Sequence, residues 1–94
     1  MLNPAASNPN KVVEDNKTMT RASAGFYTAE YDYSTLASQG YKLAAVFAES
    51  GTSAYHLIPY IHDSANHSIK VQTIESGLAT GLTINAHFTM LFVQ

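Results

Sequence analysis

The 94-residue sequence contains no cysteine, so disulfides and thiolate metal sites are excluded. Charged residues make up only 13% of the chain, about half of the usual quarter. The five basic residues are scattered and the net charge is −2, whereas a nucleic-acid-binding face needs clustered positive charge. No apolar run approaches the roughly 20 residues of a membrane-spanning helix. We therefore expect neither nucleic-acid binding nor membrane insertion.

A chain of this length has room for one hydrophobic core. Its first residues, MLNPAASNPN, are rich in Asn, Pro, Ala and Ser. We expect residues 1–16 to be a linker or a disordered segment, and residues 17–94 to form the domain. The low charge content, combined with many Tyr, Thr, Ser and His residues, suits a surface that contacts carbohydrate or protein.

Apolar and polar residues alternate through much of residues 17–94, which is the pattern of β-strands. In FYTAEYDY this alternation gives a face of Tyr27, Ala29, Tyr31 and Tyr33. In YKLAAVFAE it gives a face of Tyr41, Leu43, Ala45 and Phe47. Six or seven short strands, spaced by about 8–12 residues, indicate an all-β fold. We predict a small antiparallel β-sandwich, jelly-roll-like, with six to eight strands.

Two segments interrupt this regularity. Pro59 lacks the N–H group that a ladder needs, so AYHLIPYIH is predicted to be an edge strand or to be bulged at the proline. STLASQG is too short for a stable isolated helix and is predicted to form one helical turn. Ser34 or Thr35 would cap that turn and Gly40 would end it.

The strongest alternation lies in LTINAHFTMLFVQ. The face predicted to point to the interior consists of Leu82, Ile84, Ala86, Phe88, Met90 and Phe92. The opposite face consists of Thr83, Asn85, His87, Thr89, Leu91 and Val93. Because Leu91 and Val93 are unsuited to water, we predict that this second face contacts sister subunits of a homotrimer. The alternative is that both side chains pack beneath a loop of the same chain.

The histidines do not show the spacing of a metal site. His56 and His62 would lie roughly 20 Å apart on one extended strand, too far for one ion. His62, Asp63 and His67 surround one loop, but their spacing matches no familiar metal motif. His87 offers a different hypothesis, in which three copies meet at a threefold axis and hold an ion or water. We predict no metal and no cofactor.

Catalytic patterns are equally absent from the sequence. No G-x-S-x-G elbow occurs, and no glycine-rich loop joins a strand to a helix. Glu30 and Asp32 share a strand face, but nothing places this carboxylate pair beside a sugar. We predict a protein without catalytic residues, with a small glycosidase or esterase as the enzymatic alternative.

Aromatic and polar residues gather along the segment 55–67. Sugars present apolar C–H patches ringed by hydroxyls, and rings with hydrogen-bonding tips suit them. The candidate saccharide contacts are Tyr55, His56, Tyr60, His62, Asp63, Asn66 and His67. The alternative is that Tyr55 or Tyr60 belongs to the core and the other residues form an ordinary loop.

Two segments resemble the tail-tip domains of bacteriophages. YSTLASQGYKLAAVFAESG is similar to a segment of those domains in which a short turn precedes Gly-Tyr, here Gly40-Tyr41, and an apolar strand. HSIKVQTIESGLATGLTINAHFTMLFVQ resembles their ending, although it finishes with Phe92-Val93-Gln94 in place of Tyr and Lys. The resemblance covers approximately residues 26–94.

This resemblance implies a C-terminal receptor-binding domain at the distal end of a tail fibre or baseplate protein of the virion. Such domains are β-sandwiches, commonly trimeric, and some bind cell-surface saccharides. We therefore expect a non-enzymatic domain that attaches a phage to a bacterial surface saccharide. The alternative is a structural trimerisation cap that has no ligand of its own. The resemblance transfers no binding residue to this chain.

Overall fold

The computed structural model describes residues 10–51 and 55–94. Strands make up 57% of the described residues and helix 6%, which confirms the all-β class. Within the described residues the elements are β1 (Lys11–Thr18), β2 (Thr20–Arg21), β3 (Tyr27–Asp32), α1 (Ser34–Ser38), β4 (Lys42–Ser50), β5 (Leu57–Asp63), β6 (Ser68–Thr73) and β7 (Asn85–Val93). No helix in the described part of the chain is long and apolar enough to cross a membrane.

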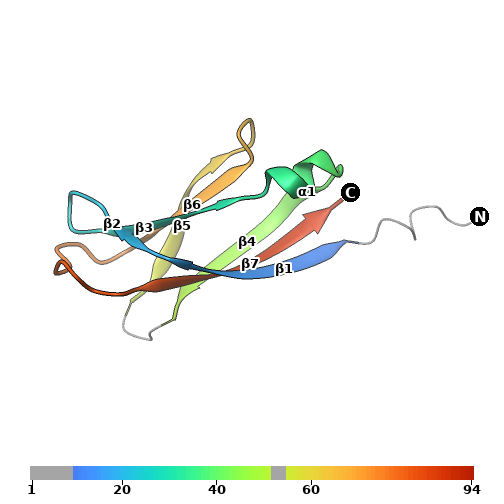
Figure 1. Ribbon diagram of the computed structural model, residues 1–94. Helices are drawn as coiled ribbons and strands as arrows, with labels where there is room; N and C mark the ends of the chain where they lie inside the picture. The colour runs from blue at the N-terminus through green and yellow to red at the C-terminus, as the bar shows by residue number, and fades with distance from the viewer. Residues whose placement is uncertain (1–9, 52–54) are drawn as a thin grey trace, which may run out of the picture.

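The strands form two antiparallel sheets (Figure 1). One sheet has the order β1-β7-β4, with the last strand of the chain at its centre, and the other has the order β2-β3-β6-β5. The chain passes from the first sheet to the second at Met19, where β1 ends and β2 begins. In Figure 1 the C-terminal end of β7 and helix α1 lie at the same end of the molecule.

The core lies between the two sheets. The inner side of β7 supplies Ala86, Phe88, Met90 and Phe92, which are at most 1% exposed. Tyr27, Ala29 and Tyr33 of the second sheet and its neighbouring loop are also buried, as are Ile69 and Val71 of β6. The predicted inward face of β7 is therefore confirmed from Ile84 to Phe92, and the predicted face of β3 is confirmed as well.

The strand assignment of Leu82 and Thr83 is wrong. β7 begins at Asn85, and Leu82 is 36% exposed. The buried hydroxyl of Tyr27 holds the preceding segment, because it donates to Ala79 O at 2.7 Å and accepts from Leu82 N at 3.1 Å. This tyrosine satisfies backbone groups that a strand ladder would otherwise satisfy. Thr83 therefore does not belong to the outward face of β7.

The predicted face of Tyr41, Leu43, Ala45 and Phe47 is correct for Tyr41 and Leu43, which contact the core, and wrong for Ala45 and Phe47, because β4 contains a bulge. Leu43 pairs with Phe92 and Ala45 with Leu91, so Ala44 is an extra residue. One extra residue turns every following side chain to the opposite face. Phe47 is consequently 71% exposed, on the side of the sheet away from the core.

Strand β1 includes Lys11–Asn16, which the sequence assigned to a linker; residues 1–9 lie outside the described part of the chain. An edge strand tolerates this charged stretch because its side chains reach the rim of the sandwich. Lys17 Nζ lies 3.5 Å from Asp15 Oδ2, and Lys11 Nζ lies 5.1 Å from the centre of the Tyr41 ring. The domain therefore starts at least as early as Lys11.

The two interrupting segments behave largely as predicted. β5 is an edge strand, and its pairing with β6 is irregular between Pro59 and Ile61. Helix α1 is the expected single turn and is followed by Gly40, whose φ is 91°. Its first turn is stabilised differently from the prediction, because Asp32 Oδ1 accepts from Ser34 N at 2.8 Å and no side chain caps the helix.

Candidate functional site

The seven predicted saccharide contacts do not meet at one place. Tyr55 and His56 lie just before β5, Tyr60 lies in its irregular middle, and the other four surround the turn from β5 to β6. The two ends of a seven-residue strand are roughly 20 Å apart. The structure therefore divides the predicted set into three locations.

Tyr55 and His56 belong to a structural contact. Tyr55 is half-buried and packs against the core. His56 Nδ1 lies 3.2 Å from Glu75 Oε1, and the same carboxylate accepts from His56 N at 3.1 Å. The pKa of Glu75 is lowered mainly by a hydrogen bond from the backbone amide of Glu75 itself, and to a smaller extent by the hydrogen bonds from His56. This pair ties the start of β5 to the end of β6.

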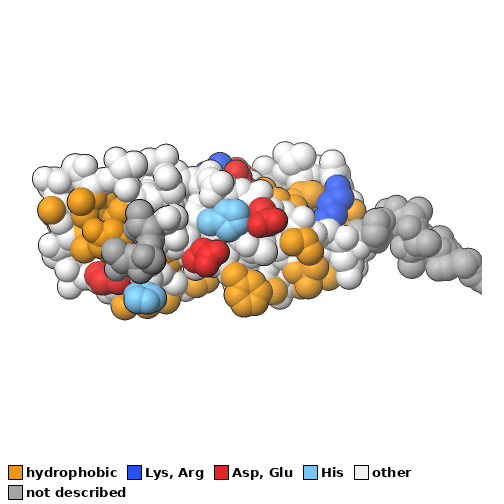
Figure 2. Space-filling model, turned by 90° about the horizontal axis from the view of Figure 1, so that it is seen from below, with side chains coloured by type: hydrophobic (Ala, Val, Ile, Leu, Met, Phe, Trp, Pro, Cys, Tyr) orange, Lys and Arg blue, Asp and Glu red, His pale blue; other side chains and the backbone are white. Residues whose placement is uncertain are grey.

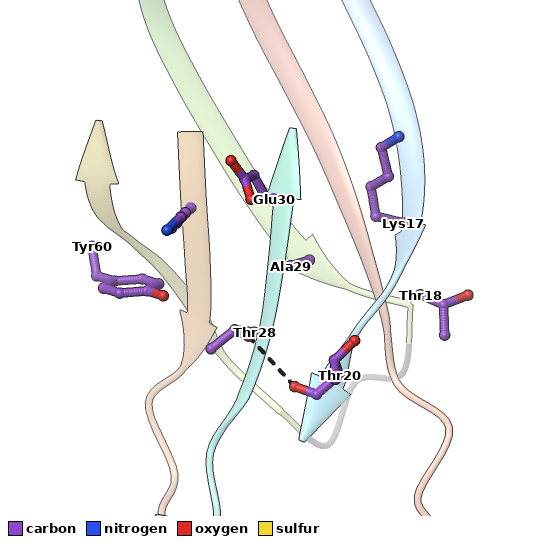
Figure 3. A pocket seen from close by; sticks show the side chains of 8 residues that line it. Lys17, Thr18, Thr20, Thr28, Ala29, Glu30 and Tyr60 are labelled. Atoms are coloured by element: carbon purple, nitrogen blue, oxygen red, sulfur yellow. Dashed lines mark hydrogen bonds between the residues drawn. The ribbon is translucent and has the colours of Figure 1, made fainter. Parts of the chain in front are cut away.

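Tyr60 borders an open depression on the outer side of the four-stranded sheet, which we call the sheet trough (Figure 3). Its volume is about 320 Å³. The lining residues are Lys17, Thr18, Thr20, Thr28, Ala29, Glu30, Tyr60 and Lys70. In Figure 3, Tyr60 lies on one side of the trough, Thr18 and Thr20 lie on the other, and Thr28 lies between them.

The sheet trough combines an exposed ring with varied polar groups. Tyr60 is 41% exposed. Glu30 and Lys70 are opposite each other on β3 and β6, and Thr28 Oγ1 donates to Thr20 O at 3.5 Å. An aromatic ring beside hydroxyl, carboxylate and ammonium groups can stack on a sugar and hydrogen-bond its hydroxyls. Among the described lining residues Glu30 is the single carboxylate, whereas glycoside hydrolysis uses two.

His62 and His67 line a second depression, the end cleft, beside α1 and the β5–β6 turn. It measures about 430 Å³, and its polar lining consists of Tyr33, Tyr41, Lys42, His62, Ser64 and His67. Tyr33 Oη lies 2.6 Å from His62 Nε2, and the His67 ring packs edge-on against Tyr33 at 5.6 Å. Burial, with a smaller contribution from Asp63, raises the pKa of Tyr33 and keeps its hydroxyl protonated.

Asp63 and Asn66 shape the turn beside the end cleft without lining it. Asp63 Oδ1 accepts from Ala65 N at 3.0 Å and Asn66 N at 3.1 Å, while its Oδ2 accepts from Asn66 Nδ2 at 2.7 Å. The side-chain and backbone hydrogen bonds from Asn66 lower the pKa of Asp63. Both residues therefore have a conformational role in this turn.

The turn should make stability depend on pH. Because the pKa of Asp63 is lower in the folded chain, its contribution is present above the unfolded value of about 3.9 and is lost as the pH falls through the folded value. Asp63→Asn removes the bond from Asn66 Nδ2. We expect wild type to melt at a higher temperature than this variant near pH 7, with the difference vanishing towards pH 2. Thermal melts across this range test the prediction, and a pH-independent difference would contradict it.

The outer side of the β1-β7-β4 sheet carries five of the six predicted trimer contacts, Asn85, His87, Thr89, Leu91 and Val93 (Figure 2). The strand registers give three rows across it: Val12–Leu91–Ala45, Glu14–Thr89–Phe47 and Asn16–His87–Glu49. Val12 is 69% exposed and Phe47 71%. In Figure 2 a histidine and acidic side chains lie near the middle of this face, with hydrophobic side chains to either side. We call these nine residues the outer face.

His87 is engaged within its own chain. Its Nδ1 lies 2.8 Å from Asn16 Oδ1 and its Nε2 lies 2.9 Å from Glu14 Oε1. Both ring nitrogens therefore already face an oxygen atom of β1. Across residues 10–51 and 55–94, no three histidine or acidic side chains are close enough together to hold a metal ion.

The sequence did not reveal which polar residues lie beside Tyr60 in the sheet trough, or beside His62 and His67 in the end cleft. Thr28, Glu30 and Lys70 reach the sheet trough because β3 pairs with β6, a register that local periodicity does not specify. Lys42, at the start of β4, lines the end cleft together with Ser64 and His67 of the β5–β6 turn, although it is distant from them in sequence. In the sequence, the feature that pointed to the sheet trough was Tyr60, which follows a proline in a predicted edge strand.

Comparisons with protein-family models, with curated proteins and with solved structures found no match to this chain.

Proposed function

We propose that this chain is a non-enzymatic binding module of the β-sandwich class, and that the sheet trough is its saccharide site. More specifically, it is the receptor-binding tip of a bacteriophage tail fibre or baseplate protein, carried on the virion and attaching to a bacterial surface saccharide. The resemblance of residues 26–94 to such tips supports the phage context. The observation that carries the binding function is the exposed Tyr60 ring beside the polar floor of the trough.

The chemistry of the trough suits recognition better than turnover. The Tyr60 ring offers an apolar surface, while Thr28, Glu30 and Lys70 offer a hydroxyl, an acceptor and a donor. Such contacts are individually weak. If three copies assemble, linked sites raise the avidity by about 10²–10⁴ when the ligand spans them.

Binding is tested with a glycan array of bacterial surface polysaccharides, followed by calorimetry with the oligosaccharide that binds most strongly. We expect Tyr60→Ala to weaken that binding at least about fivefold, since stacking on an aromatic ring contributes about 1–3 kcal/mol. Ile61→Ala is the matched control, because Ile61 is a 45% exposed neighbour that does not line the trough. Both variants should melt near the wild-type temperature.

Three results would contradict the proposed site. The first is that no polysaccharide on the array binds. The second is that Tyr60→Ala binds as tightly as wild type, and the third is that Ile61→Ala loses the same affinity. Release of reducing sugar from a bound polysaccharide would instead support the enzymatic alternative.

A second candidate function is a structural cap that holds three fibre chains together. The observation that favours it is that Val12 and Phe47 are exposed on one face, beside Leu91 and Ala45, because clustered exposed apolar side chains mark interaction surfaces. The sheet edges are protected by the bulge in β4, by Pro59 in β5 and by the charged rim of β1. Copies would therefore associate through faces and not through strand edges.

The solution mass tests this second function. A trimer that dissociates when Phe47 is replaced, with saccharide binding absent in both forms, would support the cap. A wild-type chain that stays monomeric at high concentration would contradict it.

A further inference from the structure

We propose that the end cleft is a second binding site, for the anionic group of a small ligand, a carboxylate or a phosphate. The donors are the Lys42 ammonium and the imidazoles of His62 and His67. This site is separate from the sheet trough, because the two depressions share no lining residue. The inference therefore does not depend on the saccharide site.

The charge of the lining favours an anion. Among the described residues, Lys42, at the start of the edge strand β4, is the only lining residue of fixed charge, and no carboxylate lines the cleft. Within the same part of the chain no carboxylate forms a salt bridge with Lys42. The hydroxyl of Ser64 lies on the same lining and adds a neutral donor. An ammonium and ring N–H groups are donors that shorten and strengthen hydrogen bonds to carboxylate and phosphate oxygens.

The two histidines are held in position by Tyr33. The tyrosine oxygen lies 2.6 Å from His62 Nε2, which fixes that ring and leaves its Nδ1 for another partner. His67 packs edge-on against the same tyrosine, whose own ring is buried against Phe92 at 5.4 Å. The two imidazoles therefore stand on a rigid support, which reduces the conformational entropy that binding would otherwise cost.

The backbone conformation of His67 places its ring at the end cleft, and its carbonyl accepts from Tyr33 N at 2.8 Å. Its φ is 55°, and no other non-glycine residue in the described part of the chain has a positive φ. Glycine or asparagine would adopt this left-handed conformation with less strain. Histidine is among the residues that tolerate this region, and in this turn the conformation brings the His67 side chain to the lining of the end cleft.

Two carboxylates lie near the cleft and limit its affinity. Asp63 accepts three hydrogen bonds within its own turn, and Asp32 accepts from Ser34 N. Neither side chain lines the cleft, but each lowers the positive potential there. We therefore expect bare anions to bind with a dissociation constant on the order of millimolar, with a complete ligand gaining affinity from the apolar part of the lining.

The site is tested by NMR titration of the whole chain, using inorganic phosphate in one arm and acetate in the other. We expect saturable shifts in the backbone amides of residues 40–43 and 62–68 in at least one arm, and the arm that saturates first identifies the preferred anion. Lys42→Gln should weaken this binding about tenfold. Lys70→Gln, which removes a lysine from the sheet trough, is the matched control and should leave it unchanged.

His67→Asn separates binding from structure, because asparagine tolerates the left-handed turn. We expect weaker anion binding together with a melting temperature equal to or above that of wild type. A purely structural His67 would instead lower the melting temperature. The proposal is overturned if neither anion produces saturable shifts at the cleft, or if Lys42→Gln binds as wild type does. Tyr60→Ala should retain anion binding, so failure of the saccharide site would leave this result unaffected.

Discussion

Phe88→Ala is expected to lower the free energy of unfolding by about 3–5 kcal/mol, the range for deleting a fully buried phenylalanine side chain. Phe88 is 0% exposed and its ring lies 5.8 Å from that of Tyr31 across the sandwich. Small domains are stabilised by only about 5–15 kcal/mol, so this one change would remove much of the margin. Urea unfolding followed by circular dichroism measures it.

Phe47→Ala is the matched control, because it makes the same chemical change on the other face of the same sheet. Ala48 pairs with Phe88, so Phe47 lies beside this position on β4 and points outward. The change should cost less than about 1 kcal/mol when the chain is studied as a monomer. Similar costs for the two variants would contradict the placement of Phe47 outside the core, and with it the bulge at Ala44.

The same variant also separates stability from assembly. If copies cover the outer face, Phe47→Ala should lower the solution mass while the unfolding free energy of the single chain hardly changes. Phe88→Ala should affect both, because an unfolded chain cannot assemble. Sedimentation equilibrium on the two variants therefore shows whether the exposed apolar residues contact other copies.

Periodicity predicted the inner side of β7 well because nothing interrupts its alternation from Asn85 to Val93. It failed at Phe47 because a bulge is a backbone event, and the repeated Ala44-Ala45 gives no sign of which residue is extra. It also failed at Leu82, where the tertiary contact with the Tyr27 hydroxyl replaces the ladder. Local pattern thus predicts strands reliably only where no distant group competes for the backbone.

The candidate sites depend still more on distant pairing. Glu30 and Lys70 face each other only because β3 and β6 are neighbours, and no local pattern specifies that partnership. Tyr60 and His62 are two residues apart, yet the irregularity at Pro59 sends them to different depressions. Residue types alone indicated aromatic and polar binding chemistry in segment 55–67, but they could not indicate how many sites share it.

Gly25→Ala is expected to destabilise the domain by about 2–4 kcal/mol, through two separate effects. Gly25 has a φ of 83°, a conformation that costs an alanine about 1 kcal/mol or more. In addition, a Cβ atom at Gly25 would lie 2.8 Å from both Cα and N of Gly77, so two backbone segments would have to separate. Overpacking of this kind typically costs another 1–3 kcal/mol or so.

Gly81→Ala isolates the first effect. Gly81 also has a φ of 83°, but a Cβ atom placed on it would meet nothing within 4 Å in the described part of the chain. Its substitution should cost about 1 kcal/mol, and the excess cost of Gly25→Ala then measures the contact between the two loops. This contact matters because Leu78 N donates to Gly25 O at 2.9 Å, joining the β2–β3 loop to the segment that leads into β7. Equal costs for the two variants in urea unfolding would show that the loops do not touch, and would leave the Tyr27 hydroxyl as the main contact that holds residues 74–84.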